Sequence, residues 1–232
     1  MMLVSGDGKL ARALVNLTSD DLQVIKLPKK VMDITDEYEV SETIKRYITQ
    51  PNYPKYFVHT AALTKPMSIN DRNPIMSLST NIVGTANVAK ICHKYGIKFI
   101  YISTDFVYDS VDGVGEDSGL KPSNKYGWSK LGGECVTKLI PESLILRCSL
   151  CDIPFRHKVA FDDVYRNSII HTDVAKIILK VKGECGVINV GGKYQSVFDF
   201  VSEHQDVNKA SGNNIAPSLE LNTEKLMGLI NE

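Results

Sequence analysis

Short apolar runs alternate with longer amphipathic segments along the first 150 residues of the chain. The apolar runs predict buried strands, and they span residues 2–5, 22–27, 56–60, 98–104 and 143–149. Segments between them, such as 81–95, place apolar residues three or four positions apart, which is the spacing of one helix face. Alternating strands and helices predict an α/β fold with a doubly wound parallel sheet.

Beyond residue 149 the segments become shorter. Helical spacing recurs at 171–182 and 196–204, a strand is predicted at 186–190, and residues 205–216 have the composition of an exposed loop. We therefore expect a main domain over residues 1–148, with the run at 143–149 as its sixth strand. A small, interleaved α/β lobe is expected over residues 149–232.

The composition is that of an ordinary globular protein. Of 232 residues, 43% are hydrophobic and 23% are charged, which is enough to build a sizeable core. The 27 basic and 27 acidic residues form no long block of one sign, so we expect neither nucleic-acid nor membrane partners. No apolar run approaches the roughly 18 residues of a spanning helix, and the start, MMLVSGDGK, lacks the features of a secretory signal. The cytoplasm is the expected compartment.

The cysteines favour free thiols, because there are five of them and no secretory signal accompanies them. Cys148 and Cys151 form a single C-x-x-C motif. A structural zinc site needs about four ligands, and no second pair follows. We expect no bound metal.

A glycine motif follows the first predicted strand. Its sequence fits Gly-x-Gly-x-x-Ala and precedes a helical run; the residues are Gly6, Asp7, Gly8, Lys9, Leu10 and Ala11. In such motifs the first glycine permits a tight turn, the second lets the backbone approach a pyrophosphate, and the small third residue allows close helix packing. The motif predicts a dinucleotide site with phosphate at the start of the helix. An ordinary loop turn is the alternative interpretation.

The strand at 98–104 ends in Ser103 and Thr104, and a helix predicted from residue 126 carries Tyr126 and Lys130. Residues four apart share a helix face, so the lysine ammonium can stabilise a tyrosinate. Lowering a phenol pKa from about 10 to ~7 takes about 4 kcal/mol, which a nearby ammonium and a cationic nicotinamide ring could supply. Thr104 would hold a substrate carbonyl near the phenol. Taken alone, a Tyr-x-x-x-Lys pair is more often a solvated pair on a helix surface.

The stretches STDFVYDS and YGWSKLGGE resemble the extended short-chain dehydrogenase/reductases, and most closely their dTDP-4-dehydrorhamnose reductase branch. The resemblance implies a Rossmann-type fold in which Thr104, Tyr126 and Lys130 are the catalytic residues. The related 4,6-dehydratases have an Asp-Glu pair after this threonine, whereas Phe106 follows Asp105 here. This difference favours a reductase over a dehydratase.

The resemblance also assigns the residues around the cofactor. Besides Tyr126 and Lys130, it implies contacts from Asp33, Ile34, Thr60, Ala61, Ala62 and Leu63. The glycine motif adds Gly6, Gly8, Lys9, Leu10 and Ala11 to the expected cofactor contacts, and the cations after the second strand add Lys29. The related reductases usually have one more residue between the first two glycines. No acidic residue ends the strand at 22–27; instead, cations that could hold a 2′-phosphate lie nearby, namely Arg12, Lys26, Lys29 and Lys30. We expect NADPH as the cofactor, with NADH as the alternative, although lysines after a strand are commonly just solvated.

The substrate side departs from the family. Leu150 and Cys151 stand where relatives have an aromatic residue, and only the nine residues DIPFRHKVA replace a longer segment that closes over the nucleotide-sugar. The expected substrate contacts are Lys65, Thr104, Asp105, Phe106 and Arg156, with Arg156 either binding a diphosphate or lying in a solvated loop.

The sequence therefore predicts NADPH-dependent reduction of the C4 keto group of a 4-keto-6-deoxy nucleotide-sugar. Two alternatives stay open: a nucleotide-sugar epimerase that retains its cofactor, and a non-catalytic, NADP-binding regulatory subunit. Helices that flank such sheets often pair, so a homodimer is compatible with the sequence.

Overall fold

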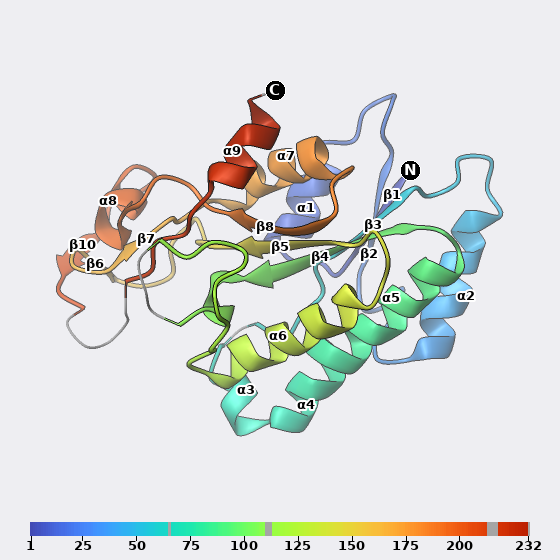
Figure 1. Cartoon of the computed structure of the whole chain (residues 1–232), viewed down its shortest axis with the longest axis horizontal. Coiled ribbons are helices and arrows are strands. Elements are labelled where there is room, and N and C mark those ends of the chain that lie inside the picture. The colour runs from blue at the N-terminus through green and yellow to red at the C-terminus, as the bar shows by residue number, and fades with distance from the viewer. Residues whose placement is uncertain (65, 110–112, 213–217, 232) are drawn as a thin grey trace.

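A parallel six-stranded sheet forms the centre of the molecule (Figure 1). The computed structural model describes residues 1–64, 66–109, 113–212 and 218–231. The strand order is β2-β1-β3-β4-β5-β8, and the strands are β1 (Met2–Ser5), β2 (Val24–Leu27), β3 (Tyr56–His59), β4 (Lys98–Thr104), β5 (Leu144–Cys148) and β8 (Gly186–Val190). The predicted fold class, a doubly wound parallel α/β sheet, is confirmed.

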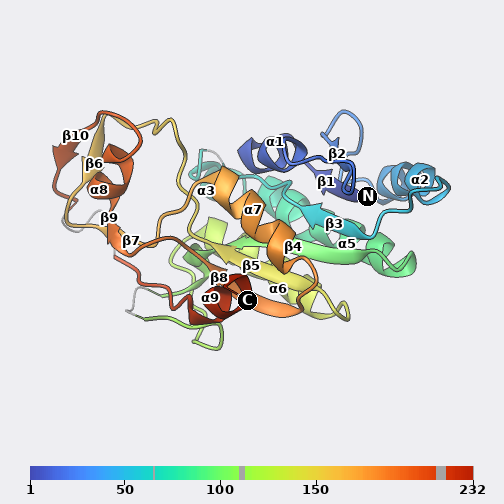
Figure 2. The ribbon, with the colours of Figure 1, turned by 90° about the horizontal axis from the view of Figure 1, so that it is seen from above.

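Helices cover both faces of this sheet, as the two views show (Figures 1 and 2). One face carries α1 (Lys9–Val15), α7 (His171–Val181) and α9 (Glu224–Ile230). The other carries α2 (Glu37–Ile48), α5 (Gly84–Lys94) and α6 (Lys125–Lys138). The sheet is therefore buried on both sides, which explains why its strands have nearly continuous apolar sequences.

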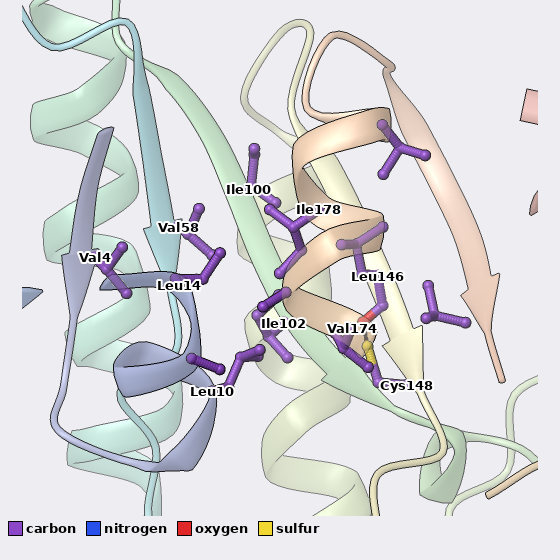
Figure 3. Packing of buried hydrophobic residues seen from close by; sticks show 14 of the residues in the cluster. Val4, Leu10, Leu14, Val58, Ile100, Ile102, Leu146, Cys148, Val174 and Ile178 are labelled. Atoms are coloured by element: carbon purple, nitrogen blue, oxygen red, sulfur yellow. Dashed lines mark hydrogen bonds between the residues drawn. The ribbon is translucent and has the colours of Figure 1, made fainter. Parts of the chain in front are cut away.

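Each strand sends alternate side chains into the two cores. On β4, Ile100 and Ile102 pack towards α1 and α7 (Figure 3), whereas Phe99 and Tyr101 pack on the other side of the sheet. Ile178 of α7 is fully buried against the first of these cores. Burying such a side chain contributes about 1.5–3 kcal/mol, so these two cores hold the strand ends in fixed positions.

The strand order reverses at β1. The chain passes from β1 to its neighbour β2 on one side and then returns to β3 on the other side of β1. Loops that follow the two strands on either side of such a point diverge and leave a crevice at the carboxyl edge. Gly6, with φ of 89°, makes the turn after β1. A Cβ at this position would lie 3.1 Å from the backbone of Ala61, which follows β3.

Between β3 and β4 the chain forms α3 (Ile69–Arg72), α4 (Pro74–Leu78) and a π-helical turn (Ser79–Val83) that continues into α5. The helix predicted at 81–95 is therefore present, but its first turn is π-helical. Such turns are frequent at functional sites. A short 3₁₀-helix, Asp105–Val107, follows β4 directly.

The second lobe is smaller than predicted, because two of its expected elements belong to the main sheet. Helix α7 packs on α1, and β8 pairs with β5. The run at 143–149 is thus the fifth strand of the sheet in chain order, and the sixth is β8.

The remaining lobe lies apart from the sheet in Figure 2. It contains β6 (Val159–Phe161) paired with β10 (Asn208–Ala210), β7 (Tyr165–Arg166) paired with β9 (Gln195–Ser196), and α8 (Val197–Ser202). The expectation of a loop over 205–216 is wrong where β10 forms, and residues 213–217 lie outside the described part of the chain. Among the described helices, none has the length and apolarity needed to cross a membrane.

Candidate active site

Three adjoining cavities run along the carboxyl edge of the sheet. They have volumes of about 300, 210 and 170 Å³. The first two share Gly8, Thr60, Ala62 and Thr64. The second and third share Thr64, Ser103, Tyr126, Leu150, Asp152 and His171. Together they form one groove that leads from the β1 and β2 loops to the start of α6.

Most residues expected around the cofactor line the first two cavities. They are Gly6, Gly8, Lys9, Leu10, Lys29, Asp33, Ile34, Thr60, Ala61, Ala62, Tyr126 and Lys130. Ala11 is fully buried in the core beneath α1, and the Leu63 backbone N–H donates to Asn81 Oδ1 at 2.7 Å. A Cβ at Gly8 would meet only open space. The groove thus has the open backbone and the small side chains that let a dinucleotide approach closely.

The cations expected near a 2′-phosphate are partly engaged by the protein itself. Asp7 accepts from Arg12 at 3.2 Å and also pairs with Lys26. These hydrogen bonds, first from Arg12 and then from Lys26, lower the pKa of Asp7 to about 2. Lys29 lines the first cavity and lies 3.2 Å from Asp33. The preference for NADPH stays a prediction.

Helix α6 begins where the chain leaves β4, and this junction brings the predicted catalytic residues together. Asn124 caps the helix by accepting from the Gly127 N–H at 2.8 Å. A Cβ at Gly127 would overlap the Phe106 carbonyl oxygen, so only glycine lets α6 approach the 3₁₀-helix after β4 this closely. Thr104 and Tyr126 consequently line the same cavity.

Tyr126 is protonated in the protein as it stands. Removal from water raises the pKa of its phenol well above the ordinary value, and the Asp105 carboxylate raises it further. A hydrogen bond with Thr104 acts in the opposite direction. Tyr126 therefore carries the proton that a proton donor needs. The protein groups around it do not by themselves lower the pKa of its phenol towards 7, so they do not produce a tyrosinate.

Lys130 lies one helical turn from Tyr126 and is only 3% exposed. Burial lowers the pKa of its ammonium to about 7, although Glu134, a turn further on, acts to raise it. Its Nζ lies 4.1 Å from the centre of the Tyr101 ring, a distance suited to a cation–π interaction. The Tyr101 hydroxyl donates to the Lys130 carbonyl at 3.2 Å, so the strand beneath α6 fixes both ends of this residue.

Asp105 is held in place by three donors. Its carboxylate accepts from Thr104 at 3.1 Å, from Ser149 at 2.9 Å and from Arg166 of β7 at 3.0 Å. The Arg166 guanidinium also lies over the Phe106 ring, with 5.2 Å between the guanidinium carbon and the ring centre. The second lobe therefore helps to hold the loop after β4, next to the predicted catalytic residue Thr104.

A buried polar network connects the two sides of the groove. Ser5 Oγ lies 2.9 Å from His59 Nδ1, and Thr85 lies 3.2 Å from His59 Nε2. Thr85 donates to the Asn81 carbonyl at 2.8 Å, and the Asn81 amide donates to Ser129 at 2.8 Å. Burial lowers the pKa of His59 to about 3, so this histidine is neutral and serves as a hydrogen-bonding link.

The structure adds residues that the sequence pattern did not single out. Asp152 and His171 line two of the cavities, and Asp152 lies 3.5 Å from Lys9 and 3.6 Å from Arg156. The sequence offered one signal for Asp152. This residue comes shortly after a predicted parallel strand, and ligands of this fold bind beyond the carboxyl ends of the strands. Arg156 reaches the second cavity, and Phe106 reaches the third. Lys65, the remaining expected substrate contact, lies outside the described residues.

No group of three or more His, Cys, Asp or Glu side chains could hold a metal ion within the described parts of the chain. Cys148 is buried at the end of β5, Cys151 is partly exposed, and neither forms a disulfide.

Fold and groove together define a doubly wound α/β protein of the dinucleotide-binding type, with a threonine, a tyrosine and a lysine at one end of the groove. The chain belongs to the RmlD substrate binding domain family, whose model matches residues 1–151.

Among curated proteins, the dTDP-4-dehydrorhamnose reductase of Mycolicibacterium smegmatis is 32% identical over 130 residues, which are 53% of this chain and 37% of that protein. The methionine adenosyltransferase 2 subunit beta of Xenopus laevis is 33% identical over 96 residues, or 41% of this chain and 28% of that protein. The chain thus spans less than half the length of these relatives. A solved dTDP-4-dehydrorhamnose reductase from Bacillus anthracis, in complex with NADP, has the same fold, with a TM-score of 0.84 and 21% identity over 97% of this chain and 91% of that one.

Proposed function

We propose that this protein uses NADPH to reduce the C4 keto group of a 4-keto-6-deoxy nucleotide-sugar. The observation that carries the proposal is the meeting of Thr104, Tyr126 and Lys130 at the end of a groove that a glycine motif opens. The names of the reductases that it resembles support the same chemistry.

Bound NADPH would supply a hydride to the carbonyl carbon. The raised pKa of Tyr126 keeps its phenol protonated at neutral pH, so this hydroxyl donates the proton to the carbonyl oxygen. Thr104 orients that oxygen by hydrogen bonding. When charged, the Lys130 ammonium stabilises the tyrosinate that remains after the transfer. The proton donor, the orienting group and the stabilising cation all come from this chain.

The preference for NADPH is part of the proposal and depends most on Lys29. Four cations were expected near the 2′-phosphate, and among the described residues only Lys29 lines the cavity that would hold the adenosine. Replacing Lys29 by alanine is expected to weaken NADPH binding several-fold and to leave NADH binding nearly unchanged, because only NADPH carries the 2′-phosphate. Fluorescence titration with each cofactor measures both affinities. Equal weakening for the two cofactors would contradict the assignment.

The direct test is NADPH consumption on addition of a 4-keto-6-deoxy nucleotide-sugar generated in situ. The expected result is one molecule of reduced sugar nucleotide for each NADPH oxidised. Bound NADPH that survives prolonged incubation with the keto-sugar would refute the proposed reduction.

A second function is a non-catalytic, NADP-binding regulatory subunit. It is favoured by the short connection after β5 and by the relatives named methionine adenosyltransferase 2 subunit beta. Nucleotide binding without turnover, together with a changed activity of a partner enzyme, would support it. An epimerase, the third candidate, would purify with stoichiometric nicotinamide.

A further inference from the structure

Three basic side chains from three separate segments surround a single carboxylate in the groove. Lys9 belongs to the glycine motif and begins α1, Arg156 lies in the short connection after β5, and His171 begins α7. Their nitrogens lie 3.5, 3.6 and 3.7 Å from the carboxylate oxygens of Asp152. Lys9 also donates to the Ile153 carbonyl at 2.9 Å, which ties the glycine loop to the connection.

This cluster lies between the two ends of the groove. All four side chains line the cavity of about 210 Å³ that also contains Gly8 at one end and Tyr126 and Lys130 at the other. A ligand that runs from the glycine loop to the catalytic residues must pass it. The side chain of Asp152 is 12% exposed, whereas those of Lys9 and Arg156 are 33% and 63% exposed. Lys9 and Arg156 can therefore reorient towards a bound ligand more easily than Asp152 can move out of the groove.

We propose that Lys9, Arg156 and His171 form a diphosphate subsite in which the Asp152 carboxylate takes the place of the ligand's phosphate until the ligand binds. The inference rests on the proposed function, since it assumes that a nucleotide diphosphate enters this groove. A carboxylate and a phosphate are both anions that pair with lysine and arginine side chains, so one can substitute for the other beside the two cations, Lys9 and Arg156.

The diphosphate could belong to the dinucleotide or to the nucleotide-sugar. In either case Asp152 opposes binding, because it occupies the cations and places a negative charge beside the incoming phosphates. Removing its charge without changing its shape should therefore tighten binding. A structural role, in which Asp152 merely arranges the cations, predicts the opposite sign.

The test uses Asp152→Asn in the full-length protein, with isothermal titration of NADP⁺ and, separately, of dTDP. We expect about tenfold tighter binding of the probe that uses the subsite. A gain for NADP⁺ alone assigns the subsite to the cofactor, and a gain for dTDP alone assigns it to the sugar nucleotide. Asp173→Asn is the matched control, because Asp173 lies in the first turn of α7 and pairs with the exposed Lys176 at 2.9 Å; neither affinity should change.

Unchanged or weaker binding of both probes by Asp152→Asn, with wild-type protein binding NADP⁺ normally, would overturn this inference and leave the proposed reductase intact. Failure of the wild type to bind NADP⁺ or NADH at all would instead refute the proposed function. Arg156→Gln keeps the inference testable should the first variant misfold. It is expected to weaken binding of the same probe at least threefold, and unaltered affinity for both probes would count against the subsite.

Discussion

Replacing Lys130 by methionine should stabilise the protein, and the gain should shrink as the pH rises. Burial lowers the pKa of this lysine from 10.5 to about 7 in the folded protein. Between these two pH values the unfolded chain binds more protons than the folded one, so the free energy of unfolding of the wild type rises with pH. The destabilisation caused by burying the charged Lys130 ammonium is fully present below pH 7, and it has disappeared above the pKa of this lysine in the unfolded chain.

The size of the effect follows from the pKa difference of about 3.5. At about 1.4 kcal/mol for each pH step, the penalty amounts to about 5 kcal/mol below pH 7 and falls by about 3 kcal/mol between pH 6.5 and pH 9. Methionine has a similar length and no charge, so Lys130→Met should lack this pH-dependent increase in stability.

Urea unfolding of both proteins at several pH values measures the difference, and other titrating groups cancel in the comparison. Lys138→Met, on the exposed side of the same helix, should follow the wild type. Parallel profiles for the wild type and Lys130→Met, within about 0.5 kcal/mol, would refute the conclusion that folding buries this ammonium at an energetic cost.

Two further variants test the support beneath α6. Gly133→Ala should destabilise by about 1–3 kcal/mol, since a Cβ there would overlap the Tyr101 hydroxyl. Thermal unfolding measures this loss, and Gly228→Ala in α9, where a Cβ meets open space, should be neutral or stabilising; similar losses in both variants would contradict the packing argument. Glu134→Gln should cost about 3 kcal/mol, because it removes one charge of the buried ion pair in which Arg147 Nη2 lies 2.8 Å from Glu134 Oε2. Denaturant unfolding of this variant at wild-type stability would show that the pair contributes little.

The parts that local sequence determines were predictable. Strands β1 and β4 are short apolar runs buried on both faces, and their bounds follow the sequence closely. Tyr126 and Lys130 could be placed on one helix face because a four-residue spacing is a local property. The glycine motif likewise contains its own turn, with Gly6 at positive φ.

The parts that long-range pairing determines were not predictable. The apolar pattern of β8 is the same whichever sheet it joins, and only its pairing with β5 places it in the main one. Asp152, His171 and Arg166 come from segments that have no motif in common, so their approach to the groove depends on the complete fold. The low pKa of Lys130 arises from burial beside Tyr101, which a sequence alone does not reveal.

The central claim is that Tyr126 gives its proton to a keto-sugar oxygen, and Tyr126→Phe tests it most directly. NADPH affinity and NADPH oxidation should both be measured for this variant and the wild type, using the 4-keto-6-deoxy nucleotide-sugar made in situ. We predict that the variant binds NADPH within about threefold of the wild type and loses at least a hundredfold in turnover, the contribution typical of a positioned general acid. Turnover equal to that of the wild type would contradict the account, because the proton would then have to come from another group.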